Sequence, residues 1–121
     1  QIFSLYESTL RKRFGTKCGV ATKNLPLLVR RFQEWDLELP VVLTHVNKAG
    51  FHVNPSLKEC EETLQDPALT VMAMGTLASG FLTPNEAYPY VNRFSSVKSI
   101  VVGVSSVEHV DVTLRAISKI V

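Results

Sequence analysis

Gly103, Ser105 and Ser106 form a turn of small and hydroxyl-bearing residues just before a stretch with the pattern of a helix. The first N–H groups of a helix have no partner within the helix, and the helix dipole is positive at that end. Phosphate groups bind well in such a place. The three residues therefore predict a phosphate-binding site, while the same pattern also fits an ordinary helix cap with nothing bound.

A second loop of small residues lies between Gly75 and Gly80. We expect these two glycines to line the same binding mouth as the first turn. The alternative is a tight turn that needs glycine only for unusual backbone angles.

His45 follows a run of β-forming residues and has Asn47 and Lys48 close by. A histidine at the end of a strand can act as an acid, a base or a metal ligand, or it can be a hydrogen-bonded packing residue. His52 and His109 do not stand at a spacing from it that would indicate a metal site. The sequence thus predicts neither a catalytic residue nor a metal ligand in this chain.

The length and composition favour one domain over residues 1–121 with a sizeable core. The net charge of +2 is too small to indicate nucleic-acid binding, and no apolar run is long enough for a transmembrane helix. Cys18 and Cys60 indicate neither a disulfide framework nor a zinc site. We therefore expect a cytoplasmic protein with no membrane partner. The sequence begins with Gln1 and not with methionine, which predicts a fragment, a processed product or a missing start.

These residues must be positioned by strands that alternate with helices. Three β-rich runs each lead to a helix that starts with a capping-box pattern, in which a hydroxyl and a glutamate stand three residues apart. The runs are 40–46, 70–74 and 99–104, and the boxes begin at Ser56, Thr83 and Ser105. A further strand is expected at 18–22, followed by Asn24 as a helix cap. Strands separated by single helices predict an α/β fold of parallel βα repeats.

Five helices are expected, at 1–14, 26–35, 56–65, 84–94 and 107–120. Pro89 predicts a kink or an early end in the fourth of them. The run 99–104 lacks polar alternation, which is typical of a strand covered on both faces. Four βα units fit half of a TIM-type (β/α)8 barrel, and they also fit an open doubly wound sheet with helices on both faces.

Three strings together resemble the C-terminal half of the aldo/keto reductases, from the fourth helix to the eighth. Residues 19–24 (GVATKN) resemble the family's fifth strand, and residues 72–80 (MAMGTLASG) resemble its seventh strand and the loop after it. Residues 102–110 (VGVSSVEHV) resemble the eighth strand and the start of the last helix. The segment 45–56 (HVNKAGFHVNPS) is similar to barrel proteins of unassigned function, so the resemblance points to an uncharacterised branch.

The resemblance implies a parent NAD(P)-dependent oxidoreductase whose phosphate-binding end lies in this segment, with NADP as the implied cofactor. The implied cofactor-binding residues are Asn24, Gly75, Gly80, Gly103, Ser105 and Ser106. The family's catalytic tyrosine, lysine, aspartate and histidine lie on the first four strands, which this chain does not contain. Val112 and Thr113 stand where the family has a Glu-Asn pair that binds adenine. We therefore expect the isolated chain to be inactive.

A half barrel has two unpaired edges and an uncovered inner face, which favour pairing with another chain. The expected partner is a second copy in a twofold homodimer, or the missing N-terminal half-barrel, together with a phosphate-bearing small molecule. The alternative function is a non-catalytic, self-associating βα module without a bound cofactor.

Overall fold

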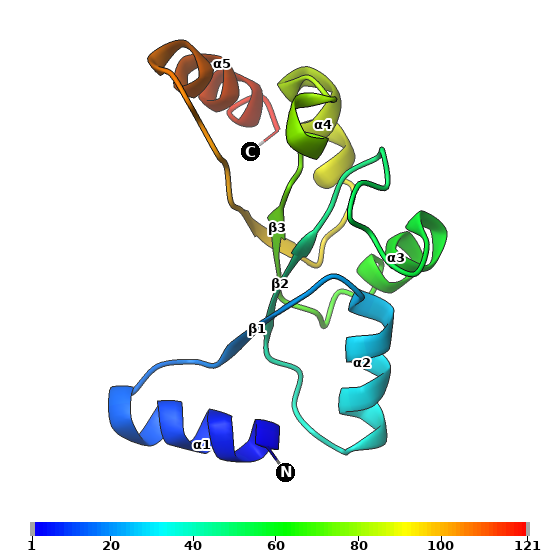
Figure 1. Cartoon of the computed structure of the whole chain (residues 1–121), viewed down its shortest axis with the longest axis vertical. Helices are drawn as coiled ribbons and strands as arrows, with labels where there is room; N and C mark the ends of the chain where they lie inside the picture. Colours follow the sequence, from blue (N-terminus) through cyan, green and yellow to red (C-terminus); the bar gives the residue numbers. More distant parts are fainter. Residues whose placement is uncertain (1, 121) are drawn as a thin grey trace.

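The computed structural model describes residues 2–120. Their four strands form a single parallel sheet (Figure 1). The strands are β1 (Gly19–Thr22), β2 (Val41–His45), β3 (Val71–Met74) and β4 (Val97–Ile100). Each strand pairs in parallel with the next one along the chain, in the order β1-β2-β3-β4. This confirms the α/β fold of parallel βα repeats. The order is compatible with half of a βα barrel, and it lacks the reversal that defines a doubly wound sheet.

Helices connect the strands. They are α1 (Ile2–Phe14), α2 (Leu25–Glu34), α3 (Leu57–Leu64), α4 (Pro84–Val91) and α5 (Val107–Ile117), with a short 3-10 turn η1 (Ala78–Gly80) before α4. Helices α4 and α5 lie side by side at one end of the molecule (Figure 1). Within residues 2–120, no helix has both the length and the apolar character needed to cross a bilayer.

One face of the sheet carries the core. Helices α2, α3 and α4 all pack on that face, as consecutive right-handed crossovers in a sequential sheet require. The core contains Leu25 and Val29 of α2, Val42, Leu64 of α3, Val71, Ala73 and Val91 of α4. On the opposite face Val41, Leu43, Met72 and Met74 are only half-buried. The expectation of helices on both faces of the sheet, which belonged to the open-sheet alternative, is therefore wrong for α2–α4.

The helix caps follow the predicted patterns in two of three places. The hydroxyl of Ser56 accepts from the N–H of Glu59 at 3.2 Å. The carboxylate of Glu86 accepts from both the N–H and the hydroxyl of Thr83, at 3.0 and 2.7 Å. Helix α4 then ends at Val91, so the early end predicted from Pro89 is confirmed.

The third helix start differs from its prediction. Helix α5 is capped by Ser106, whose hydroxyl accepts from the N–H of His109 at 3.2 Å. The prediction of a capping box from Ser105 to Glu108 is therefore wrong by one residue. Ser105 is not free to cap, because its hydroxyl bonds to Nδ1 of His109 at 2.9 Å.

The apolar run before α5 is not the strand that its composition predicts. Strand β4 ends at Ile100, and Val101, Val102 and Val104 are exposed. The N–H of Val101 still donates to the carbonyl of Ala73 at 2.8 Å, but β3 ends one residue after Ala73. With no neighbouring strand to pair with, the run leaves the sheet. The predicted fourth strand therefore exists, but it covers Val97–Ile100, and the expectations that it extends to residue 104 and is covered on both faces are wrong.

Candidate functional site

A cavity of about 650 Å³ lies between the loop after β3, the run after β4 and helix α5. We call it the α5 cavity. Four of the predicted cofactor residues, Gly75, Gly80, Gly103 and Ser105, line it together. The two glycine-containing loops are far apart in the sequence, and the parallel register of β3 and β4 brings their carboxyl ends to one edge of the sheet. Ligands of parallel α/β sheets bind at this edge.

The remaining two predicted residues lie elsewhere. Ser106 is not among the residues that line the cavity, and its hydroxyl is used as the cap of α5. Asn24 caps α2, where its Oδ1 accepts from the N–H of Leu27 at 3.0 Å. Asn24 also forms an isolated β-bridge with Asn54. The side chain of Asn24 therefore accepts a backbone hydrogen bond at the start of α2, and Asn24 does not line the α5 cavity.

A buried tyrosine lines the α5 cavity. Tyr88 is fully buried, and its hydroxyl has no hydrogen-bond partner among the described residues. Burial raises the pKa of Tyr88, while the hydroxyls of Thr76 and Thr113, which lie near the Tyr88 hydroxyl but do not meet the geometry of a hydrogen bond, act in the opposite direction. Both threonines are buried and also line the cavity. An unsatisfied buried hydroxyl costs about 1–3 kcal/mol, so this group gains from a ligand that bonds to it.

The walls and the mouth of the α5 cavity differ in chemistry. Its walls are largely aliphatic and include Leu77, Leu82, Val102 and Val112. At the start of α5 the carboxylate of Glu108 interacts with its own backbone N–H and with Ser106, and these contacts lower the pKa of Glu108. Of the described residues, those that line the cavity include no lysine or arginine. The walls of the cavity are therefore suited to an uncharged group, and only hydroxyls and backbone N–H groups at its mouth could contact an anion.

His45 is the last residue of β2, and its ring lies close to Gly75, which lines the α5 cavity. Its ring centroid is 5.3 Å from that of His52, a residue that its spacing in the sequence did not connect to His45. The loop between them folds back over the strand ends, since the N–H of Asn54 donates to the carbonyl of Lys23 at 3.1 Å. A seven-residue separation within an irregular loop carries no periodic signal, so the structure was needed to find this pair.

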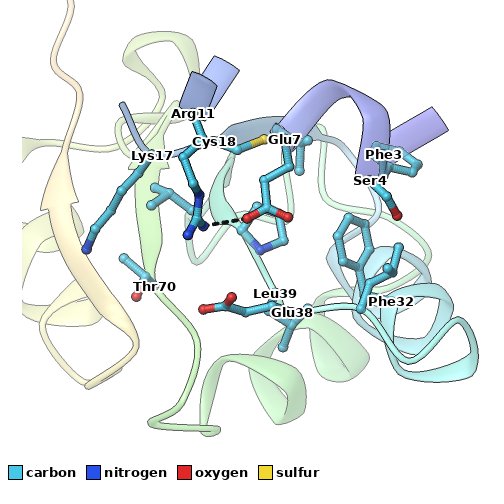
Figure 2. Close-up of a pocket in the computed structure, with 14 residues that line it drawn as sticks. Phe3, Ser4, Glu7, Arg11, Lys17, Cys18, Phe32, Glu38, Leu39 and Thr70 are labelled. Atoms are coloured by element: carbon cyan, nitrogen blue, oxygen red, sulfur yellow. Dashed lines mark hydrogen bonds and ion pairs between the residues drawn. The ribbon is translucent and has the colours of Figure 1, made fainter. Parts of the chain in front are cut away.

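A smaller cavity of about 190 Å³ lies at the other end of the strands, where α1 packs beside β1 and β2 (Figure 2). Figure 2 shows the ion pair between Arg11 and Glu7, both on α1, whose N···O distance is 2.6 Å, while Lys17 and Glu38 line the same cavity. Burial and the charge of Glu7 raise the pKa of the Cys18 thiol, which lines the same cavity. Burial also raises the pKa of Cys60, to about 11. Neither thiol has the environment of an activated nucleophile.

Comparison of this chain with protein-family models, with curated proteins and with solved structures found no match.

Proposed function

We propose that this chain is the C-terminal half of an aldo/keto-reductase-like barrel, and that the α5 cavity receives the adenosine and phosphate end of NADP. The proposal places the nucleoside against the aliphatic walls and a phosphate near Gly103 and Ser105. The isolated chain would bind without catalysing, because the family's catalytic residues belong to strands that it does not contain.

One observation carries this proposal: Gly75, Gly80, Gly103 and Ser105 surround a single cavity that also contains the unpartnered hydroxyl of Tyr88. Its volume of about 650 Å³ lies within the range of small-molecule sites. The Tyr88 hydroxyl is itself buried, so a ribose hydroxyl or an adenine nitrogen would bond to it only after a shift of the side chains around it. The start of α5, an 11-residue helix, would supply N–H groups and a positive dipole end to a phosphate.

Glu108 is the group that opposes a phosphate at this position. Its carboxylate is an anion beside the first N–H groups of α5. The side chain is exposed, so it can turn into solvent without a desolvation cost and free its backbone N–H. Replacing it with a neutral side chain should therefore strengthen the binding of a phosphate-bearing ligand.

Isothermal titration of the chain with NADP⁺, and separately with NAD⁺, tests the proposal. We expect saturable binding that Glu108→Gln strengthens and Ser105→Ala weakens. Ser118→Ala at the other end of α5 is the matched control and should bind like the unmodified chain. The absence of saturable binding, or equal effects of the two serine substitutions, would reject the cofactor site.

The uncovered face of the sheet favours a second candidate, a self-associating module. Val41, Leu43, Met72 and Met74 on this face are only half-buried, and in the described part of the chain no strand pairs with the outer edge of β1 or of β4. Two copies related by a twofold axis would cover these residues. In the first candidate, the N-terminal half-barrel would cover them instead.

Light scattering coupled to size exclusion separates the two candidates. A dimer that Leu43→Lys converts to a monomer, while Leu114→Lys on exposed α5 does not, would support self-association. A monomer for the unmodified chain would reject self-association and leave the face for an N-terminal half-barrel.

A further inference from the structure

Lys23, His45 and His52 come together at the carboxyl ends of β1 and β2, and we call them the histidine cluster. Lys23 lies one residue past the end of β1, beside the strand that ends at His45, and its carbonyl accepts from the N–H of Asn54 in the loop that carries His52, at 3.1 Å. The rings of His45 and His52 have their centroids 5.3 Å apart. His45 alternates with Val41 and Leu43 on the sheet face that α2–α4 leave uncovered, and Lys23 and His52 are exposed. The cluster is therefore open to a ligand.

The loop that carries His52 is held in place by a buried amide. Asn47 is 1% exposed, and its Nδ2 donates to the carbonyls of Phe51 and Gly75 at 2.9 and 3.2 Å. Its Oδ1 accepts from the N–H of Phe51 at 2.8 Å. The ring of Phe51 lies against the His52 ring, with centroids 4.1 Å apart. These contacts fix the position of His52 before any ligand binds, which lowers the entropic cost of binding.

Gly75 makes room for the His45 ring. A Cβ atom on Gly75 would lie 2.5 Å from Cδ2 of His45, which is closer than real Cβ contacts. Gly75 also has a φ of +60°, a conformation that side-chain-bearing residues adopt at a cost. The position of the imidazole is therefore fixed by the backbone of the next strand.

The cluster presents hydrogen-bond donors. Nδ1 of His45 is buried and has no partner among residues 2–120. A buried acceptor without a partner is less costly than a buried donor without one, so the neutral ring carries its proton on Nε2. Burial lowers the pKa of His45, and the charges of His52 and Lys23 lower it further, which keeps the ring neutral. The ammonium of Lys23 adds a full positive charge.

The same charges disfavour a metal ion. Lys23 repels a cation at this position, and the described residues contain no group of three or more histidine, cysteine or acidic side chains placed to hold a metal. The groups that act on the pKa of His45 include no acidic side chain. A cluster of donors with a net positive charge and no internal anion selects an anionic ligand.

We propose that the histidine cluster binds the carboxylate group of a small molecule. The ammonium of Lys23 is the charge partner, and the rings of His45 and His52 donate hydrogen bonds to the carboxylate oxygens. This site is separate from the cofactor proposal, because none of its three residues lines the α5 cavity.

Sodium acetate is the probe for this proposal, with sodium chloride at equal ionic strength as the reference. We expect saturable shifts of the His45 and His52 imidazole signals in NMR spectra of the full chain, and an upward shift of the His45 pKa because the bound anion favours the charged ring. Lys23→Gln should weaken acetate binding by about tenfold or more, since it removes a hydrogen bond to a charged group.

Lys58→Gln is the matched control, because Lys58 is an exposed lysine on α3 whose charge does not act on His45. It should leave acetate binding unchanged. Lys23 is exposed, so Lys23→Gln should keep the fold, and the backbone amide spectrum verifies this. The proposal is overturned if acetate shifts the histidine signals no more than chloride does, or if both lysine variants bind acetate equally.

Discussion

The α5 cavity and the histidine cluster lie at the same edge of the sheet but have opposite chemistry. The cavity has aliphatic walls, a buried hydroxyl and an exposed carboxylate at its mouth. The cluster is open and cationic, with no acidic side chain among the groups that act on His45. One edge of a parallel sheet can thus present an apolar site after β3 and β4 and a charged site after β1 and β2.

Gly75 belongs to both regions, which makes the comparison testable. It lines the α5 cavity, and it also leaves the space that the His45 ring fills. The Lys48–Glu86 ion pair, with an N···O distance of 3.3 Å, is a second connection, because it joins the loop beside the cluster to the start of α4. Substitutions of Gly75, Lys48 or Glu86 should therefore affect both the α5 cavity and the histidine cluster. Substitutions elsewhere in either region should affect that region alone.

Gly75→Ala should have the largest effect. The new Cβ meets the His45 ring and the residue must keep a φ of +60°, so the free energy of unfolding should fall by about 2 kcal/mol or more. Urea unfolding measures this change.

Two other glycines separate the effect of the steric contact from the effect of the positive φ. Gly80→Ala meets no atom within 4 Å but has a φ of +89°, so it should cost only the backbone strain of about 1 kcal/mol. Gly103 has neither a close neighbour nor a positive φ, so Gly103→Ala should change the free energy of unfolding little. If Gly75→Ala cost no more than Gly80→Ala, the close fit between Gly75 and His45 would be wrong.

Tyr88→Phe should have the next largest effect, and the opposite sign. It removes an unsatisfied buried hydroxyl, so the free energy of unfolding without ligand should rise by about 1 kcal/mol. Affinity for NADP⁺ should fall in the same variant if the nucleoside bonds to this hydroxyl. Thermal and urea unfolding, together with titration, give the two values.

Tyr90→Phe is the control for Tyr88→Phe. The Tyr90 hydroxyl donates to Glu61 at 2.9 Å, so its removal should destabilise the fold and leave nucleotide binding unchanged. A destabilised Tyr88→Phe variant would show that the Tyr88 hydroxyl has a partner, and the cavity would then lose its strongest polar feature.

Local patterns in the sequence predicted the elements of this fold well. The alternation of strands and helices and the caps at Ser56 and Asn24 depend on residues close in sequence, and the structure has them as expected. The prediction that residues 101–104 continue the strand was wrong, because high β propensity does not form a strand where no neighbouring strand is available to pair with. The prediction that Ser105 caps α5 was wrong, because its hydroxyl bonds to the side chain of His109, one helical turn later.

The candidate sites depended more on topology. Gly75, Gly80 and Ser105 could be grouped from the sequence because each lies in a loop directly after an expected strand, and Gly103 lies near the end of the expected strand 99–104. The approach of His52 to His45 could not be predicted, because it depends on an irregular loop held by the buried side chain of Asn47. No motif in the sequence marks Tyr88, and only its position in the fold shows that its hydroxyl lacks a partner among the described residues.

The pH dependence of stability tests the charge of the histidine cluster, with a smaller effect. The folded-state pKa of His45 lies below its ordinary value of 6.5, because burial and the charges of His52 and Lys23 disfavour the charged ring. The unfolded chain therefore binds the proton more readily, and stability is lost as the pH falls below 6.5. His45→Gln should remove this slope, and His109→Gln on exposed α5 should retain it. Urea unfolding at a series of pH values measures both slopes, and an unchanged slope in His45→Gln would contradict the prediction.

The ion pair that joins the two regions should give the smallest effect. Bonds from Thr83 and Lys48 lower the pKa of Glu86 from 4.5 to about 2. Its stabilising contribution is therefore complete above pH 4.5 and is lost as the pH falls toward the folded-state value of about 2. Glu86→Gln should lower stability slightly at neutral pH, since the side chain is exposed, and the difference from the unmodified chain should shrink in acid. Glu62→Gln, whose lysine partner lies at 3.9 Å, is the matched control and should lower stability at neutral pH by less than Glu86→Gln does. If the effects of Lys48→Gln and Glu86→Gln on the free energy of unfolding simply added in the double variant, the ion pair would contribute no interaction energy, and it would not connect the loop beside the cluster to α4.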